Sequence, residues 1–153
     1  MKAYIDTLKT IIQQGTSSKA LALSVTIGVL LGIFPVLGVT TWIITFIALR
    51  FKLNLLLMMT LSYIFWPAQI IFIIPFLRVG EWFWNATPFP LSLDQILLAF
   101  DTSIISALSD LWEANLYAVW GWLIITIPTG IASYVLLEKV FYWMIKRQQQ
   151  KSV

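Results

Sequence analysis

The sequence predicts an all-α integral membrane protein, with a broken, re-entrant helix followed by two spanning helices, and amphipathic helices at the interfaces. Hydrophobic residues make up 59% of the chain and charged residues 11%, against roughly 25% charged in soluble domains. Charge-free runs cover residues 20–49, 53–77 and 114–137, and each exceeds the about 20 residues that a spanning helix needs. Three such runs cannot be buried inside a soluble fold of 153 residues. We therefore treat residues 1–153 as a single membrane domain.

The distribution of charge predicts the orientation of this domain. The segment 79–113 contains no Lys or Arg, yet it holds five of the seven acidic residues. The ten basic residues lie elsewhere, at Lys2, Lys9, Lys19, Arg50, Lys52, Arg78, Lys139, Lys146, Arg147 and Lys151. Because Lys and Arg collect in short cytoplasmic loops, we expect residues 79–113 outside and both termini in the cytoplasm.

The amino-terminal segment, residues 1–19, predicts a short cytoplasmic helix that lies at the membrane interface. Its apolar residues recur at helical spacing, at Tyr4, Ile5, Leu8, Ile11 and Ile12. Gly15 is placed to end this helix, and its lysines suit the anionic cytoplasmic leaflet.

The first apolar run, residues 20–49, is broken near its centre by Gly28, Gly32, Pro35 and Gly38. Irregular backbone at bilayer depth is tolerated only where protein or a water-filled cavity satisfies it, so a function is expected at this break. If the run crossed once, the basic pair Arg50 and Lys52 would lie outside. A re-entrant hairpin of two half-helices keeps both ends inside, and we favour it. A single long kinked span remains the alternative, since Pro kinks are common in spanning helices.

The second run, residues 53–77, predicts a full spanning helix that is interrupted at Pro67. An aromatic belt at the outer interface follows it, at Trp82, Phe83 and Trp84.

The outer segment 79–113 then shows a capping-box spacing from Ser92 to Gln95. Apolar residues recur at helical spacing after it, at Leu93, Ile96, Leu97, Phe100, Ile104, Leu108 and Leu111. We expect an amphipathic helix there, lying on the protein or on lipid.

The last run predicts a kinked spanning helix over residues 114–145, followed by a basic cytoplasmic tail, 146–153. Gly121 precedes Pro128 by seven residues, as Gly28 precedes Pro35, and Gly130 follows closely. Broken segments in corresponding positions are typical of duplicated transporters. Chance explains the match equally well, because Gly and Pro are frequent in membrane helices.

The residue types present exclude most catalytic chemistry. The chain has no Cys and no His, which excludes disulfides, thiolate ligands and the commonest base and metal ligand. It shows neither a nucleophile–base pair nor a phosphate loop with its Lys. The apolar runs 20–49, 53–77 and 114–137 contain no charged residue that would build a proton relay. We expect no catalytic residue, no metal, no cofactor and no nucleic-acid partner.

The break carries the candidate binding site, for an anionic headgroup. If the chain turns at Pro35, then Gly38, Val39, Thr40 and Thr41 begin the second half-helix. Unpaired N–H groups and the helix dipole at such a terminus favour a phosphate or carboxylate. Arg78 is a further candidate, because it is the sole cation near the outer interface and can pair with a lipid phosphate.

Each candidate also has a structural interpretation. Gly28, Gly32 and Gly38 can simply allow neighbouring helices to approach. Asn54 is placed to cap the second span, and Gln69 can hydrogen-bond between helices. Arg78 can extend to ordinary headgroups.

Several of these residues form a pattern that resembles a known family. The pattern is Lys19-Ala-Leu-Ala-Leu, Gly28-x3-Gly32-x2-Pro35-x2-Gly38, Lys52-Leu53-Asn54, Trp66-Pro67 and Arg78-x-Gly80. It resembles the bacterial membrane family catalogued as domain of unknown function twenty sixty-two, over residues 16–84. This chain has Ser17-Ser18 and Trp66-Pro67 where members typically carry Ser-Pro and Asn-Pro. The resemblance implies a bacterial inner-membrane protein, and some members are joined to glycosyltransferase domains.

The functional hypothesis follows from the break and the resemblance together. We expect a small inner-membrane protein that binds or translocates an anionic lipid or a lipid-linked envelope intermediate. Because the chain is too small to enclose a wide pore alone, we expect a homo-oligomer. The alternative is a structural or adaptor subunit that docks a partner such as an envelope glycosyltransferase.

Overall fold

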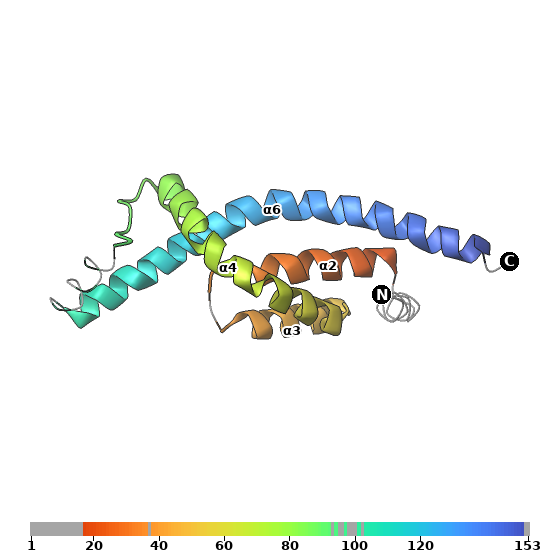
Figure 1. The fold of residues 1–153 in the computed structure, drawn as a ribbon, viewed down its shortest axis with the longest axis horizontal. Coiled ribbons are helices and arrows are strands. Elements are labelled where there is room, and N and C mark those ends of the chain that lie inside the picture. Colours follow the sequence, from red (N-terminus) through yellow and green to blue (C-terminus); the bar gives the residue numbers. More distant parts are fainter. Residues whose placement is uncertain are drawn as a thin grey trace.

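The computed structural model describes residues 17–36, 38–92, 94, 97, 101 and 103–151. Within these residues the fold consists of four helices and no strand (Figure 1). The helices are α2 (Ser18–Gly32), α3 (Thr40–Phe51), α4 (Leu55–Trp84) and α6 (Ile104–Lys151). This confirms the all-helical class. The interfacial helix expected over residues 1–19 lies, up to residue 16, outside the described residues. So does most of the outer helix expected after Ser92.

The helices α2 and α3 form a hairpin and are not one kinked helix. Ser17 caps α2, accepting a 3.2 Å hydrogen bond from the Ala20 N–H. The helix ends at Gly32 because the ring of Pro35 would clash with the carbonyl of Leu31 in a continued helix. Gly38 turns the chain with φ +84°, a conformation that glycine adopts without strain. The helix α3 then runs back alongside α2 (Figure 1).

Hydrogen bonds fix the start of α4 beside the first half of α2. Asn54 is the N-cap of α4, and its Oδ1 accepts a 3.0 Å bond from the Leu57 N–H, which confirms its expected capping role. The Asn54 N–H donates to Ser24 Oγ at 3.0 Å, and Ser24 Oγ donates to the Ala20 carbonyl at 2.7 Å. The starts of α2 and α4 therefore lie at the same end of the molecule.

The two long helices differ from their expected bounds. The helix α4 continues through Pro67 and Pro75 and ends at Trp84, so the predicted interruption at Pro67 is wrong. The helix α6 begins at Ile104 and continues through Pro128, so its first part belongs to the segment expected to lie outside the span. A proline removes one hydrogen bond, and packing against neighbouring helices can hold the helix together despite that loss.

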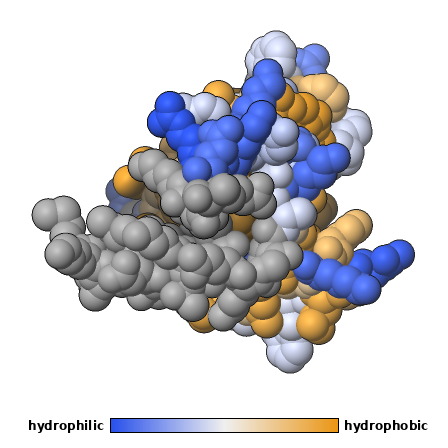
Figure 2. All heavy atoms as spheres, turned by 90° about the vertical axis from the view of Figure 1, so that its right-hand side faces the viewer, coloured by the Kyte–Doolittle hydropathy of each residue, from blue (hydrophilic) through white to orange (hydrophobic). Residues whose placement is uncertain are grey.

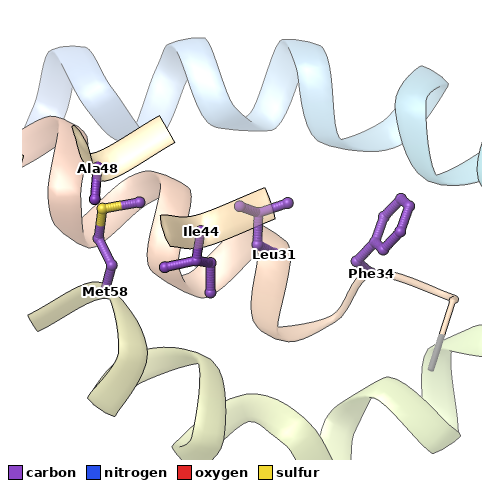
Figure 3. Close-up of a cluster of buried hydrophobic side chains, with 5 residues drawn as sticks. All are labelled: Leu31, Phe34, Ile44, Ala48 and Met58. Atoms are coloured by element: carbon purple, nitrogen blue, oxygen red, sulfur yellow. The ribbon is translucent and has the colours of Figure 1, made fainter. Parts of the chain in front are cut away.

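Two clusters of buried side chains make up the core. The larger lies between the hairpin and α4 (Figure 3) and consists of Leu31, Phe34, Ile44, Ala48 and Met58. The smaller joins α4 to α6 and consists of Leu77, Ala114 and Ala118. Phe34, in the break, meets the ring of Trp122 edge to face at 4.9 Å between centroids. The hairpin is thus held by α4 on one side and by α6 on the other.

The close crossing of α4 and α6 depends on two glycines. A Cβ atom at Gly80 would overlap the carbonyl of Tyr117, and one at Gly121 would overlap the carbonyl of Phe76. The backbones of the two helices are therefore in direct contact. Close approach through small residues is the usual way in which membrane helices associate.

Both long helices leave apolar surface uncovered. By length and composition α4 and α6 can each cross a membrane, and only 17% of their most apolar windows is buried within the fold. The end of the molecule where α2 begins also carries hydrophilic residues (Figure 2). The exposed apolar surface of α4 and α6 is of the kind that lipid or a partner protein covers.

Candidate functional site

A cavity of about 180 Å³ lies where the hairpin opens against α4. Three segments line it: the end of α2, the turn with the start of α3, and the middle of α4. The lining residues are Gly32, Gly38, Thr40, Thr41, Ser62, Tyr63, Trp66 and Gln69. The sequence pattern had singled out Gly38, Thr40 and Thr41 as ligand candidates, and the structure brings these three together.

The start of α3 supplies hydrogen-bond donors to this cavity. Its N-cap is Val39, which has no side-chain oxygen, and no side chain of the described residues caps the helix. The first N–H groups of a helix have no partner within it, and the helix dipole adds about +0.5 of an elementary charge there. The turn at Gly38 leaves open space, since a Cβ atom there would meet nothing within 4 Å. A ligand atom can therefore approach this backbone closely.

Gln69 supplies a second donor from α4. The residue is 2% exposed, and its Nε2 has no hydrogen-bond partner among the described residues. Leaving a buried amide donor unpaired costs about 1–3 kcal/mol, and such groups are rare in folded proteins. The sequence suggested that Gln69 hydrogen-bonds between helices, but among the described residues its Nε2 has no such partner. Gln69 is one of the residues that line the cavity, so this buried and unpaired donor lies in the cavity wall.

Most of the lining residues from α4 lie on one face of that helix. Ser62, Trp66 and Gln69 are spaced four and three residues apart, so they share a helix face. The Ser62 hydroxyl donates to the carbonyl of Met59 at 2.9 Å and is already satisfied. Tyr63 and Trp66 are largely exposed. None of the eight lining residues is charged, so the cavity offers neutral donors and a helix terminus.

Arg78 lies apart from this cavity. Its Nη1 forms a 2.7 Å ion pair with Oε2 of Glu81, one turn along α4. Its Nη2 donates to the carbonyl of Phe89 at 3.3 Å, while Glu81 Oε1 accepts from the Phe89 N–H at 2.7 Å. Glu81 is buried. The Arg78–Glu81 pair therefore holds the backbone of Phe89, which follows α4, against this helix. The structure therefore separates Arg78 from the other ligand candidates.

The other residues that the sequence marked have packing or capping positions. A Cβ atom at Gly28 would lie 3.0 Å from the Cα of Met58, and one at Gly32 would lie 2.9 Å from the Cα of Ser62. Gly28 and Gly32 therefore let α2 approach α4, as the packing interpretation expected. Gly121 does the same for α6 and α4. The packing interpretation is wrong for Gly38, where a Cβ atom would meet nothing within 4 Å because the residue lies in the open turn. Val39 is partly exposed at the turn and does not line the cavity.

The sequence did not indicate one residue, Trp122, that hydrogen-bonds to the end of α2 at the break. Trp122 in α6 donates from its Nε1 to the carbonyl of Leu30 at 3.1 Å. That carbonyl is one of the last four of α2, which have no partner within their own helix. Trp is frequent in this chain, with eight copies, and nothing in the local sequence distinguishes this one.

The fold and the cavity define a class: a small all-helical protein with two helices of membrane-spanning length and a helical hairpin packed against them. A family model described as an uncharacterized protein conserved in bacteria (DUF2062) matches residues 1–150. The chain belongs to this family, which confirms the resemblance seen in its Gly, Pro and Asn motifs. Neither the curated proteins nor the solved structures gave a match.

Proposed function

We propose that this protein resides in the bacterial inner membrane and binds, for translocation or handover, an anionic lipid or lipid-linked envelope intermediate. One observation carries the proposal. Gln69, whose buried Nε2 has no hydrogen-bond partner among the described residues, and the uncapped start of α3 belong to the lining of the same uncharged cavity. Donors without acceptors are matched by a ligand that brings acceptor oxygens, as a phosphate does.

Helix lengths and charge support the membrane placement. At 1.5 Å per residue, α2 and α3 extend about 22 and 18 Å, less than the roughly 30 Å of the hydrocarbon core. Both helices have their basic ends on one side, where Lys19, Arg50 and Lys52 lie. The carboxyl-terminal end of α6 points the same way (Figure 1), and it carries Lys146 and Arg147. By the positive-inside rule this side is cytoplasmic.

The depth of the cavity supports handling of lipid below the membrane surface. The start of α3 lies about 18 Å from the basic end of that helix. A headgroup that reaches the cavity has therefore left the cytoplasmic interface and entered the level of the acyl chains. A site at this depth suits a protein that extracts or moves lipid, whereas a protein that only adheres to the surface has no use for it.

The test removes the unpaired donor. Gln69→Leu is expected to leave stability unchanged or slightly higher, because it deletes an unsatisfied buried group. Retention of anionic lipid through purification, measured by native mass spectrometry, is expected to fall about tenfold, since a hydrogen bond to a charged group is worth about 1.5–3 kcal/mol. Thr60→Val is the matched control, because the Thr60 hydroxyl donates to Leu56 within its own helix on an exposed face of α4. Equal lipid retention by wild type and Gln69→Leu would refute the proposal.

The adaptor function remains a second candidate, supported by the outer face of α3. Trp42, Phe46 and Leu49 lie on one side of this helix and are strongly exposed, Trp42 to 78%. Such a face suits a second copy of the chain or a partner such as an envelope glycosyltransferase. The same purification discriminates: a stoichiometric protein partner without bound lipid would favour the adaptor.

A further inference from the structure

We infer that the cavity at the hairpin selects a singly charged phosphodiester headgroup and rejects a phosphomonoester; this rests on the proposed function and specifies its ligand. The inference depends on how much positive charge the cavity offers. Charge is a sharper criterion here than shape, because the cavity lies among apolar helices, where an unbalanced charge is expensive.

The donors of the cavity can bind the two free oxygens of a phosphodiester. Gln69 Nε2 is an unpaired amide donor, while the start of α3 offers backbone N–H groups at Thr40 and Thr41. The hydroxyls of these two threonines add donors. The donors come from two helices, so they approach a bound group from two directions. A tetrahedral phosphate with two unsubstituted oxygens meets both sets.

The positive charge of the cavity suffices for about one negative charge at most. None of the eight lining residues is basic, and the helix terminus supplies about +0.5 of an elementary charge. Arg78 is already paired with Glu81, and Arg50 lies at the opposite end of α3. The desolvation cost rises as the square of the charge, so a doubly charged phosphate costs about four times as much as a singly charged one. The second charge therefore has nothing to offset it.

The substituent of the diester has room at the mouth of the cavity. Tyr63 and Trp66 both line the cavity and are largely exposed, and they offer apolar ring faces with one polar atom each. Neither carries a charge that would reject a particular alcohol on the second ester. The chemistry therefore selects the phosphodiester group and leaves the attached alcohol open.

The experiment compares two lipids with identical acyl chains. The purified full-length protein is equilibrated with vesicles that contain equal amounts of dioleoylphosphatidylglycerol, a phosphodiester, and dioleoylphosphatidic acid, a phosphomonoester. Bound lipid is counted by native mass spectrometry at pH 8 and at pH 5. A phosphomonoester loses its second proton with a pKa of about 6, so phosphatidic acid is mainly doubly charged at pH 8 and singly charged at pH 5. Tyr63 carries the only ionisable side chain among the lining residues.

We expect phosphatidylglycerol to be retained on the order of tenfold over phosphatidic acid at pH 8, and the preference to shrink at pH 5. Thr40→Lys adds a cation at the half-exposed start of α3 and is expected to raise phosphatidic acid retention at pH 8.

Equal or greater retention of phosphatidic acid by the wild type at pH 8 would overturn the inference. If Gln69→Leu still lost both lipids in that case, the proposed function would stand. If Gln69→Leu lost neither lipid, the proposed function itself would fail.

Discussion

At the scale of residues, the presence or absence of one atom or one hydrogen bond determines the role of several positions. Gly28, Gly32 and Gly121 are needed because helix backbones approach within the space that a Cβ atom would fill. For Gly28 and Gly32 this was predictable from their spacing. The capping role of Asn54 was predictable as well, because Asn before an apolar helix start is a common N-cap. The loss of Arg78 from the site was visible in principle, because Glu81 follows it by three residues and such pairs meet on a helix.

Gly121 provides the residue-scale prediction. Gly121→Ala places a Cβ atom against the backbone of Phe76, which cannot move without separating the helices. We expect a loss of about 1–3 kcal/mol in the free energy of unfolding, measured by thermal unfolding in detergent.

Gly130→Ala in the same helix is the matched control. Its Cβ atom would meet the flexible end of the Leu30 side chain at 2.7 Å and no backbone. Because Ala is the better helix former by about 1 kcal/mol, this variant is expected to unfold at the same or a higher temperature. Equal effects of the two substitutions would contradict the close crossing.

At the scale of elements, three prolines within apolar runs have different outcomes. Pro35 ends a helix and opens a turn, while Pro67 and Pro128 lie inside continuous helices. Gly32 and Gly38 flank Pro35 closely, so the chain there loses helix propensity on both sides. The helix α2 also ends where Trp122 provides a donor for its terminal carbonyl. A proline breaks a helix when the freed groups find other partners, and those partners come from elsewhere in the chain.

The hydrogen bond that ends α2 gives the prediction at this scale. Trp122→Phe removes the Nε1 donor and leaves the Leu30 carbonyl without its partner, while an aromatic ring still faces Phe34. We expect the free energy of unfolding to fall by about 1–3 kcal/mol, measured by chemical unfolding in mixed micelles. Trp112→Phe in the exposed part of α6 is the control and should change little. A Trp122→Phe protein as stable as the wild type would show that the carbonyl does not depend on this donor.

For the whole molecule, the arrangement of helix ends brings the basic residues of distant segments to one end. The hairpin returns Arg50 and Lys52 to the end where α2 begins, and α6 brings the last basic residues to that end. The exposed aromatic residues Trp82, Phe83 and Trp84 lie at the far end of α4. Exposed aromatic residues also lie at the basic end, at Tyr142 and Trp143, so basic residues collect at one end and aromatic residues lie at both, the pattern of membrane proteins with a defined orientation.

Site-specific labelling tests this orientation. The chain contains no cysteine, so Phe51→Cys, Asn85→Cys and Gln150→Cys each introduce a single thiol. An impermeant maleimide added to intact cells is expected to label position 85 alone. Positions 51 and 150 should react only after the membrane is permeabilised. Labelling of position 51 from outside would mean that the first apolar run crosses the membrane, and the proposed membrane placement of the hairpin would be wrong.

The sequence by itself determined the helical class, the two helices of spanning length and the place of the break. These follow from composition and from Gly and Pro positions, which act through local backbone geometry. It also indicated three residues of the cavity, because a helix start after a turn has free N–H groups wherever it lies. Only the tertiary structure decided that Gln69 is left without a partner, that Arg78 is engaged by Glu81, and that Trp122 completes α2. Whether a polar group is satisfied depends on distances between residues far apart in the chain, and the spacing of residues along a sequence contains no such distance.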